Sequence, residues 1–303
     1  MRLMPLLTVA ALLSPSVLPR AAAARHTVAC ADRSDCTAAL QAALSDVSLD
    51  DIVVPAAAAQ ARGSDEPWAV GPLFIHRSDV RLTLEPGVQL VAKQGEFKKT
   101  DECLLQIKSD MGHGHVQNVT IVATGATFRM RKMDYLPPEY EKGEWRHTLS
   151  INGASDVTVI GGTFLEAGGD GIYVDSGGLS NFSRNVLLRQ VTTDSAWRNG
   201  LSVISAINLT VVDSIFKNTN GTNPQCGIDL EPDHPTDKLQ QIELRNIKLL
   251  NNTRCGFTMG PYAFATAGAS NPLSVTVDGM QVTDTPGSNY SWVRGVSFYR
   301  NLY

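Results

Sequence analysis

The chain has 303 residues, of which 43% are hydrophobic, so it is long enough to bury a continuous apolar core. Its 26 lysines and arginines are outnumbered by 30 aspartates and glutamates, and the formal net charge is -4. This balance argues against a nucleic-acid-binding protein, which would carry a basic patch or stripe. It is also too mild to indicate any other charged partner.

Residues 1–24 have the layout of a secretory signal peptide. Arg2 gives a basic start, an apolar run extends from Leu6 to Leu13, and small residues follow at Ala21 to Ala24. The run is shorter than the roughly 20 apolar residues that a membrane-spanning helix needs, and no later segment approaches that length. We therefore expect a secreted, extracellular protein without a membrane anchor.

Secretion would place the five cysteines in an oxidising compartment, where disulfides persist. Cys30 and Cys36 are close in sequence, so a bridge between them would clip the N-terminal segment. Cys226 and Cys255 are one sequence repeat apart and are expected to stack as neighbours, which leaves Cys103 unpaired. None of the five has the spacing of a metal site.

The mature chain opens with a predicted helix and two short strands. Residues 35–44 form an amphipathic pattern with Asp35 as an acidic N-cap, and such a helix would plug the open end of an apolar core. Alternating strands follow at 80–84 and 88–91, separated by the turn Glu85-Pro-Gly. The chain stops at Asn301-Leu-Tyr without a cap, as a truncated coil would, or a coil whose last turns pair elsewhere.

Two strand types repeat from about Val116 onward. The first occurs as Asn118-Val-Thr-Ile, Asp156-Val-Thr-Val, Asn185-Val-Leu-Leu, Asn208-Leu-Thr-Val and Gln241-Ile-Glu-Leu. The second occurs as Gly171-Ile-Tyr-Val, Gly200-Leu-Ser-Val, Gly227-Ile-Asp-Leu and Gly256-Phe-Thr-Met, with the glycines 29, 27 and 29 residues apart. Periods of this size are typical of a solenoid, in which neighbouring turns of the coil bury each other's apolar residues.

We therefore predict an all-β chain: a single-stranded right-handed parallel β-helix with a short N-terminal capping helix, forming one domain over residues 25–303. Alternation in the glycine-led strands turns one set of side chains inward. This set is Ile172, Val174, Leu201, Val203, Ile228, Leu230, Phe257 and Met259. The residues between them, Tyr173, Ser202, Asp229 and Thr258, are expected to face out.

These motifs resemble the secreted right-handed β-helix proteins of the pectin-lyase-like superfamily, which includes pectate lyases, polygalacturonases and alginate epimerases. Val70-Gly-Pro-Leu-Phe-Ile and Leu82-Thr-Leu-Glu-Pro-Gly-Val are similar to the opening of polygalacturonase-type members. Gly168-Gly-Asp-Gly-Ile-Tyr-Val and the strings that begin at Arg198 and Gly227 are similar to a large group of β-helix proteins. The resemblance covers nearly the whole mature chain and implies a protein that acts on carbohydrate.

The chain departs from those families at their reactive motifs. Where polygalacturonases carry an Asp-Asp pair, it has Gly169-Asp170, and where they carry Gly-His-Gly it has Asn199-Gly200. Asp229-Leu-Glu-Pro-Asp-His matches the Asp-Pro-His-Glu motif of alginate epimerases only loosely. The resemblance therefore implies the fold more strongly than the reaction.

Four carboxylates are the candidates for catalysis: Asp229, Glu231, Asp170 and Asp175. Asp229 and Glu231 are alternate residues of one strand, about 6.6 Å apart, and Asp175 lies two strands from Glu231, about 9.6 Å away. Inverting glycoside hydrolysis needs two carboxyl groups about 6.5–9.5 Å apart, one protonated and one ionised. Two other interpretations remain: carboxylates that only keep an exposed strand soluble, or a calcium site.

Asp170 aligns with His147, Asn199, Cys226 and Cys255 at the bend before each glycine-led strand. Two interpretations stay open for it. One is a catalytic aspartate, which the resemblance to polygalacturonases favours. The other is a buried hydrogen-bonding ladder of Asp170 and Asn199 at the turn.

Two local strings recur at equivalent positions of the coil, Trp145-Arg146-His147 and Trp197-Arg198-Asn199, and Arg254 occupies the same place in a later repeat. An arginine column offers bidentate donors to carboxylates or sulfates, and tryptophan faces stack on sugar rings, which predicts an acidic polysaccharide as the ligand. The alternative is that these residues pack a corner of the coil.

His147 and Tyr173 complete the expected substrate-binding set, His147 as a candidate general acid or base with a structural histidine as the alternative. Residues 131–144, rich in tyrosine, proline and charge, interrupt the repeat and are expected to form one wall of a groove.

Three functions follow from these residues. A glycoside hydrolase would use two of the four carboxylates. A polysaccharide lyase or uronate epimerase would use an arginine or calcium to hold a uronate, and a histidine or tyrosine, with Tyr173 available, as the base. A non-catalytic glycan-binding solenoid would cut no bond. In each case the expected protein is a monomer.

Overall fold

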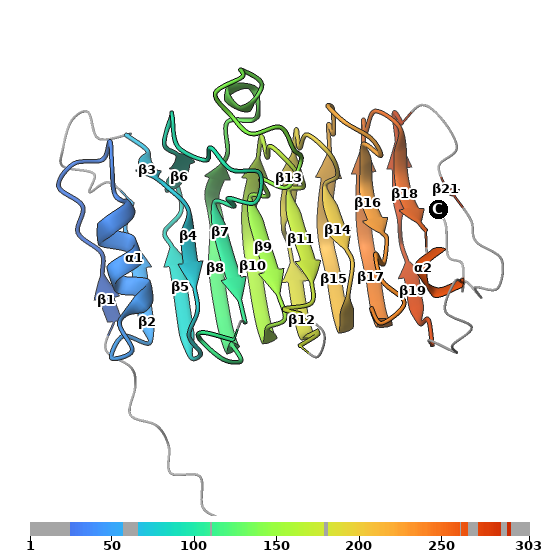
Figure 1. Cartoon of the computed structure of the whole chain (residues 1–303), viewed down its shortest axis with the longest axis horizontal. Coiled ribbons are helices and arrows are strands. Elements are labelled where there is room, and N and C mark those ends of the chain that lie inside the picture. The colour runs from blue at the N-terminus through green and yellow to red at the C-terminus, as the bar shows by residue number, and fades with distance from the viewer. Residues whose placement is uncertain are drawn as a thin grey trace, which may run out of the picture.

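The structure, a computed structural model, describes residues 25–56, 66–109, 111–178, 181–260, 262–265, 272–285 and 290–291. It is a right-handed parallel β-helix, as predicted, with short strands stacked along one long axis (Figure 1). The expected signal peptide and the last residues, Asn301-Leu-Tyr, lie outside the described residues. Within them, no helix is long and apolar enough to cross a membrane.

Two sheets of parallel strands form the walls of the coil. The larger has 13 strands in the order β1-β2-β5-β8-β10-β12-β15-β17-β19, with β3, β6, β13 and β20 attached. These strands are β1 (Arg25–Thr27), β2 (Asp51–Val54), β3 (Trp68–Val70), β5 (Val80–Leu84), β6 (Gln89–Ala92), β8 (Gln117–Arg129), β10 (Ser155–Leu165), β12 (Ser183–Arg189), β13 (Thr192–Asp194), β15 (Ala206–Lys217), β17 (Leu239–Leu250), β19 (Val275–Asp278) and β20 (Gln281–Thr283).

The second sheet has eight strands in the order β21-β18-β16-β14-β11-β9-β7-β4 and carries the glycine-led strands. They are β4 (Leu73–Ile75), β7 (Leu105–Lys108), β9 (Leu149–Asn152), β11 (Ile172–Asp175), β14 (Leu201–Val203), β16 (Cys226–Leu230), β18 (Cys255–Met259) and β21 (Tyr290–Ser291). The predicted alternation is confirmed, because Ile172, Leu201 and Ile228 stand in register and are fully buried in one continuous core.

The second or third residue of each long strand of the first sheet lies at a bend with left-handed backbone geometry. The φ angles are 57° at Asn118, 54° at Asp156, 52° at Asn185, 58° at Asn208 and 55° at Gln241. Asparagine and aspartate tolerate this region better than other non-glycine residues. Their side chains also bond along the stack: Asn185 donates to Asp156 at 2.9 Å and Asn208 to Asn185 at 2.8 Å. The repeated Asn or Asp therefore marks a stacked bend.

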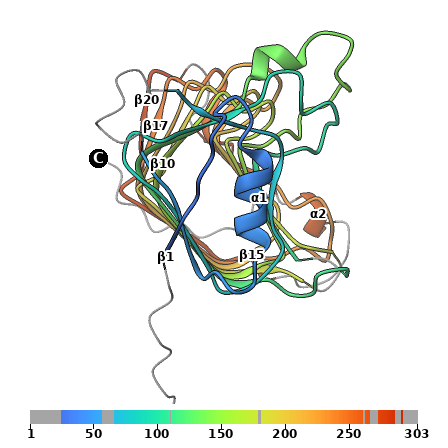
Figure 2. The ribbon, with the colours of Figure 1, turned by 90° about the vertical axis from the view of Figure 1, so that its left-hand side faces the viewer.

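The N-terminal end of the core is closed by helix α1 (Thr37–Ser45), which lies across the end of the coil (Figure 2). Leu40 and Leu44 are fully buried against the first strands. The helix begins one residue later than predicted, with Cys36 at the N-cap position, but the Asp35 carboxylate still accepts the N–H of Thr37 at 3.1 Å. The predicted plug is confirmed. A second short helix, α2 (Tyr262–Ala265), follows β18.

Both predicted disulfides are present. Cys30 is bonded to Cys36, and Cys226 to Cys255, whose Cα atoms are 4.5 Å apart because the two residues are direct partners on β16 and β18. Cys103 is buried as a free thiol.

Candidate active site

The candidate site lies on the outward side of the second sheet, over β11, β14 and β16. Tyr173, Ser202 and Asp229 are in register there, as predicted. They are not simply exposed, because Ser202 is fully buried and Asp229 is only 2% exposed. Neighbouring side chains cover this face, so its polar groups interact with one another in a partly dry environment.

Arg198 is the central cation of the site. Its Nη2 lies 3.1 Å from Glu231 Oε2, and its Nη1 lies 3.8 Å from Asp170 Oδ2. The carboxylate of Asp229 also acts on it electrostatically, and together these carboxylates raise the pKa of Arg198 against the effect of its burial. One arginine therefore interacts with three carboxyl groups from two turns of the coil, Asp170 from the turn before its own and Asp229 and Glu231 from the turn after it.

Asp170 forms the buried ladder that was one of its two predicted roles. It is fully buried, and its Oδ1 accepts the backbone N–H of Asn199 at 2.9 Å. Its own N–H donates to His147 Nδ1 at 3.0 Å. Burial raises the pKa of Asp170 to about 7, although Arg198 opposes this. With no exposed surface, Asp170 does not touch a polymer in this geometry and acts through Arg198 and Asn199.

The raised pKa of Asp170 predicts how stability depends on pH. The unfolded carboxyl releases its proton near its ordinary value of 3.8, while the folded one keeps it to about pH 7. Folding therefore takes up a proton between these values, and stability falls as pH rises. Compared with Asp170→Asn, the wild-type protein should lose up to about 1.4 kcal/mol per pH unit in this window. Urea denaturation from pH 4 to pH 8 measures this, and parallel curves for the two proteins would contradict it.

Asp229 and Glu231 form a coupled pair. Burial, the nearby Glu231 carboxylate and a hydrogen bond with that group raise the pKa of Asp229 well above its usual range, while Arg198 opposes the shift. Alternate residues of a strand have backbones about 6.6 Å apart, and here the two side chains are close enough for Glu231 to act on Asp229. Burial and Glu231 favour the protonated form of Asp229, while Glu231 forms the ion pair with Arg198.

His147 and Tyr173 are stacked on each other, with ring centroids 4.3 Å apart and planes within 6°. Burial lowers the pKa of His147 to about 3, so it stays neutral, and burial together with Asp175 raises the pKa of Tyr173. His147 is 3% exposed and its Nδ1 accepts the Asp170 amide. His147 is thus bonded to the Asp170 amide and stacked on Tyr173, and its substrate-binding role stays a prediction.

Arg146 does not belong to an arginine column facing the ligand. It is 1% exposed; its Nε donates to the carbonyl of Phe97 at 2.8 Å, and its Nη2 to that of Glu141 at 2.8 Å. Its guanidinium also lies 5.1 Å from the ring of Tyr135. These bonds anchor the excursion loop, residues 131–144, which projects beyond the strand stack and includes the 3-10 helix η1 (Lys132–Tyr135) (Figure 1). The predicted substrate contact by Arg146 is therefore wrong.

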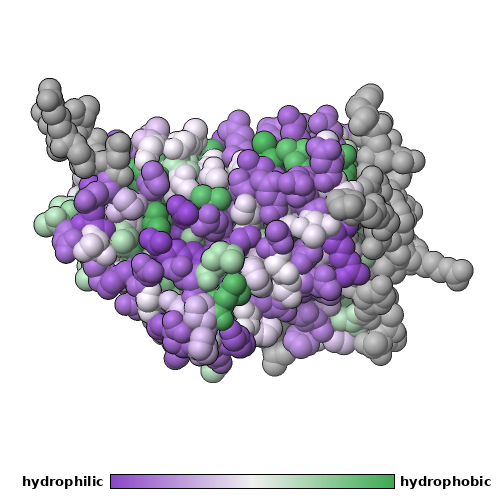
Figure 3. All heavy atoms as spheres, turned by 90° about the horizontal axis from the view of Figure 1, so that it is seen from above, coloured by the Kyte–Doolittle hydropathy of each residue, from purple (hydrophilic) through white to green (hydrophobic). Residues whose placement is uncertain are grey.

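The other predicted binding residues are spread along the same corner of the coil. Trp145 is exposed beside the excursion loop, while Trp197 is half-buried against Gly221. Arg254 is exposed and directly precedes β18. The face that carries the excursion loop is largely hydrophilic, with small hydrophobic patches (Figure 3). Trp145 thus remains a candidate platform for a sugar ring.

A pocket of about 280 Å³ lies where β11, β14 and β16 end, and it was not predicted from the sequence. Its lining includes Asp175, Phe182, Ile204, Asp233 and Asp237. Burial and the neighbouring aspartates raise the pKa of Asp175 to about 6, and burial and Glu231 raise that of Asp233. The run Pro232-Asp-His, directly after the carboxylate pair, is the sequence signal that points to it. In the described part of the chain, no group of three or more His, Cys, Asp or Glu residues is arranged to hold a metal ion, calcium included.

The geometry defines a β-helix with a carboxylate and arginine cluster on one outward face. The sequence matches no protein-family model and no curated protein. Among solved structures, the chain is similar to an alginate lyase from Paenibacillus sp. str. FPU-7, at 14% identity over 88% of this chain and 97% of that one, with a TM-score of 0.42.

Two further structures are similar to the chain. A polygalacturonase from Erwinia carotovora ssp. carotovora matches at 12% identity over 95% of this chain and 100% of that one, with a TM-score of 0.46. The surface adhesin PfbA of Streptococcus pneumoniae matches at 12% identity over 89% of this chain and 82% of that one, with a TM-score of 0.43. The parallel β-helix is established by the chain's own strand pairing, and these structures, which include enzymes and an adhesin, do not select an activity for it.

Proposed function

We propose that the protein is a secreted glycoside hydrolase that cleaves a neutral polysaccharide. The carrying observation is the pairing of Asp229, whose pKa is raised well above its usual range by burial and by Glu231, with Glu231, whose carboxylate is held by Arg198. Glycoside hydrolysis needs these two states side by side, a proton donor for the leaving oxygen and an ionised carboxylate.

The close electrostatic coupling of the two carboxyl groups supports a double displacement. Groups about 5–5.5 Å apart serve retaining enzymes, whereas inversion needs room for a water molecule between them. Asp229 gives its proton to the glycosidic oxygen as Glu231 attacks the anomeric carbon, so the bond to the leaving sugar breaks and a bond to Glu231 forms. Asp229, now ionised, then takes a proton from a water molecule that displaces Glu231, and the anomeric configuration is retained.

The charge of the site favours a neutral substrate over the acidic one expected from the sequence. Arg146 is engaged by backbone carbonyls, and Arg198 is engaged by Glu231 and Asp170. The adjoining pocket adds Asp175 and further carboxylates. A uronate placed here would meet more negative than positive charge, whereas sugar hydroxyls can donate to carboxylates. In this proposal Trp145 supplies a stacking face and the pocket receives one sugar ring.

Elimination by a lyase or epimerase is disfavoured by the groups that would act as its base. The pKa of Tyr173 is raised, so its phenolate form is rarer than usual, and the Nδ1 of His147 is already occupied. These observations support hydrolysis over elimination as the proposed reaction.

A panel of neutral and acidic polysaccharides tests the proposal. New reducing ends from a neutral polymer, without ultraviolet absorbance of unsaturated uronates, are the expected result. Proton NMR of the first product should show retention of the anomeric configuration. Absorbance with an acidic polymer would overturn the proposal in favour of a lyase, and silence across a broad panel would favour the glycan-binding solenoid.

A further inference from the structure

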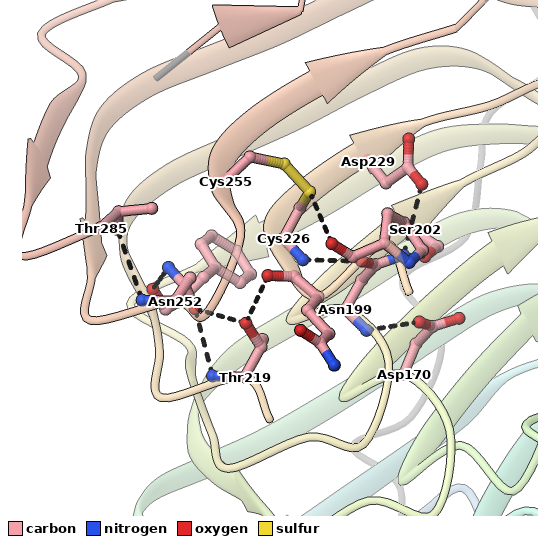
Figure 4. Close-up of a disulfide and its surroundings, with 12 residues drawn as sticks. Asp170, Asn199, Ser202, Thr219, Cys226, Asp229, Asn252, Cys255 and Thr285 are labelled. Carbon is pink, nitrogen blue, oxygen red and sulfur yellow. Dashed lines mark hydrogen bonds between the residues drawn. A yellow bond between two sulfur atoms is a disulfide. The ribbon is translucent and has the colours of Figure 1, made fainter. Parts of the chain in front are cut away.

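Asn199 bonds to two buried carboxyl groups, those of Asp170 and Asp229. It is fully buried at the bend before β14, and it contacts both Asp170 and Asp229 (Figure 4). Its backbone N–H donates to Asp170 Oδ1 at 2.9 Å, and its Nδ2 lies 3.3 Å from Asp229 Oδ2. A single residue thus bonds carboxyl groups from the turns of the coil before and after its own.

The orientation of the Asn199 amide is determined by its other partners. Its Oδ1 accepts the backbone N–H of Cys226 at 3.0 Å, and a flipped amide would place two donors against each other there. Its Nδ2 also donates to Ser202 Oγ at 3.0 Å. Cys226 is held in turn by strand pairing with Cys255 and by their disulfide. The Nδ2 group is therefore directed at Asp229 by a rigid part of the coil.

We propose that Asn199 is a positioning residue, which holds the Asp229 carboxyl in place for proton transfer while its backbone holds Asp170. This inference rests on the hydrolytic function proposed above. Asn199 does not touch the substrate, because it has no exposed surface. It acts through the carboxyl group that does the chemistry.

The proposal predicts a change in the titration of Asp229. The charged groups that face Asp229 are Glu231, Asp170 and Arg198, and a variant at Asn199 leaves all three in place. A donor such as Nδ2 stabilises the ionised form of a carboxyl. Asn199→Leu, which has a similar shape but no donor, should therefore raise the pKa of Asp229 by about one pH unit.

Asn252, which lies between β17 and β18, provides a matched control. It is also fully buried, its Oδ1 accepts from Thr219 Oγ1 at 3.1 Å, and its Nδ2 donates to the carbonyl of Phe216 at 3.1 Å. The side-chain amide of Asn252 thus bonds the hydroxyl and backbone N–H of Thr219 and the carbonyl of Phe216, and none of these is a carboxylate. Figure 4 shows Asn252 beside Asn199. Asn252→Leu should cost comparable stability without altering the titration of Asp229.

The experiment is a carbon-13 NMR titration of the Asp229 carboxyl in the full chain, for the wild type, Asn199→Leu and Asn252→Leu, together with the pH profile of kcat. We expect the higher Asp229 pKa and a matching displacement of the pH profile only in Asn199→Leu, with kcat lowered more than 10-fold and KM little changed. If Asn199→Leu does not fold, Asn199→Ser, which keeps a hydroxyl for Cys226, should give the same displacement.

The NMR readout separates the two proposals. An unchanged Asp229 pKa in Asn199→Leu, or an equal change in Asn252→Leu, would overturn the positioning role even if the protein is a hydrolase. A displaced Asp229 pKa in a protein that cleaves no polysaccharide would uphold the positioning role and overturn the proposed function.

Discussion

Glu231→Gln should lower the rate of polysaccharide hydrolysis by about 1000-fold or more. The amide keeps the size of the side chain and an oxygen for Arg198, but it cannot attack the anomeric carbon or carry the charge of the carboxylate. The initial rate of reducing-end formation, measured at several substrate concentrations, checks this. The loss should fall on kcat, because Glu231 is proposed to act in the chemical step.

Glu243 is a matched control for that substitution. Its side chain is 39% exposed and 2.7 Å from Arg245, while that of Glu231 is 40% exposed and 3.1 Å from Arg198, so both are half-open glutamates paired with an arginine. Glu243 lies on β17, in the other sheet. Glu243→Gln should retain full activity. Equal activity in the two variants would remove Glu231 from the mechanism.

Arg198→Met should be the most destabilising single change in the site at neutral and alkaline pH. It leaves the buried Asp170 carboxyl without its cation, and breaking such a pair typically costs about 3–5 kcal/mol. Arg198 lowers the pKa of Asp170, so the variant should raise that pKa above about 7. Because a protonated Asp170 needs no cation, the loss of stability should shrink as the pH falls below that value.

Denaturation of Arg198→Met at pH 5 and at pH 8 measures this difference. Arg245→Met, which breaks a more exposed ion pair, should cost about 1 kcal/mol or less at both values. The activity of Arg198→Met should also fall at every pH at which the protein is folded, because Glu231 loses the group that orients it. A loss of stability that is the same at pH 5 and pH 8 would show that Asp170 does not depend on Arg198.

Most of the fold could be predicted from the sequence, because a repeat near 28 residues and strict alternation restrict the chain to a few architectures. The glycines that open β14 and β16 illustrate why the signal is strong. A Cβ on Gly200 would come 2.5 Å from the carbonyl oxygen of Gly227, so only glycine fits between the turns of the coil. The stacked bend formed by Asn185 with Asp156 and Asn208 was less visible in the sequence. A residue with left-handed geometry inside a strand leaves the apolar alternation of the following residues intact.

The candidate site was predicted only in part, for a reason that Arg146 and Arg198 make clear. Both follow a tryptophan at equivalent places in the repeat, and nothing local distinguishes them. Their roles differ because Arg146 donates to the carbonyls of Phe97 and of Glu141 in the excursion loop, whereas Arg198 faces carboxylates from neighbouring turns. Long-range neighbours decide the role of each side chain, and a single repeat does not contain that information.

The positions of the carboxylates show the same limit. Register alone correctly placed Asp229 on the outward side and Asp170 at the bend. It did not show that Asp170 is completely buried, or that Asp229 is coupled to Glu231 beside Arg198, because both facts depend on side-chain rotamers and on what covers the sheet. A ladder of Asp170 and Asn199 was among the interpretations of the sequence, but the bond from Asn199 to Asp229 became visible only in the structure.

Digestion in water enriched in oxygen-18, with the products analysed by mass spectrometry, tests the central claim most directly. If the Asp229 and Glu231 pair hydrolyses a glycosidic bond, each new reducing end should carry one heavy oxygen, and Asp229→Asn should produce almost none. Products that lack the heavy oxygen and are lighter by one water would show elimination instead, and would contradict the account.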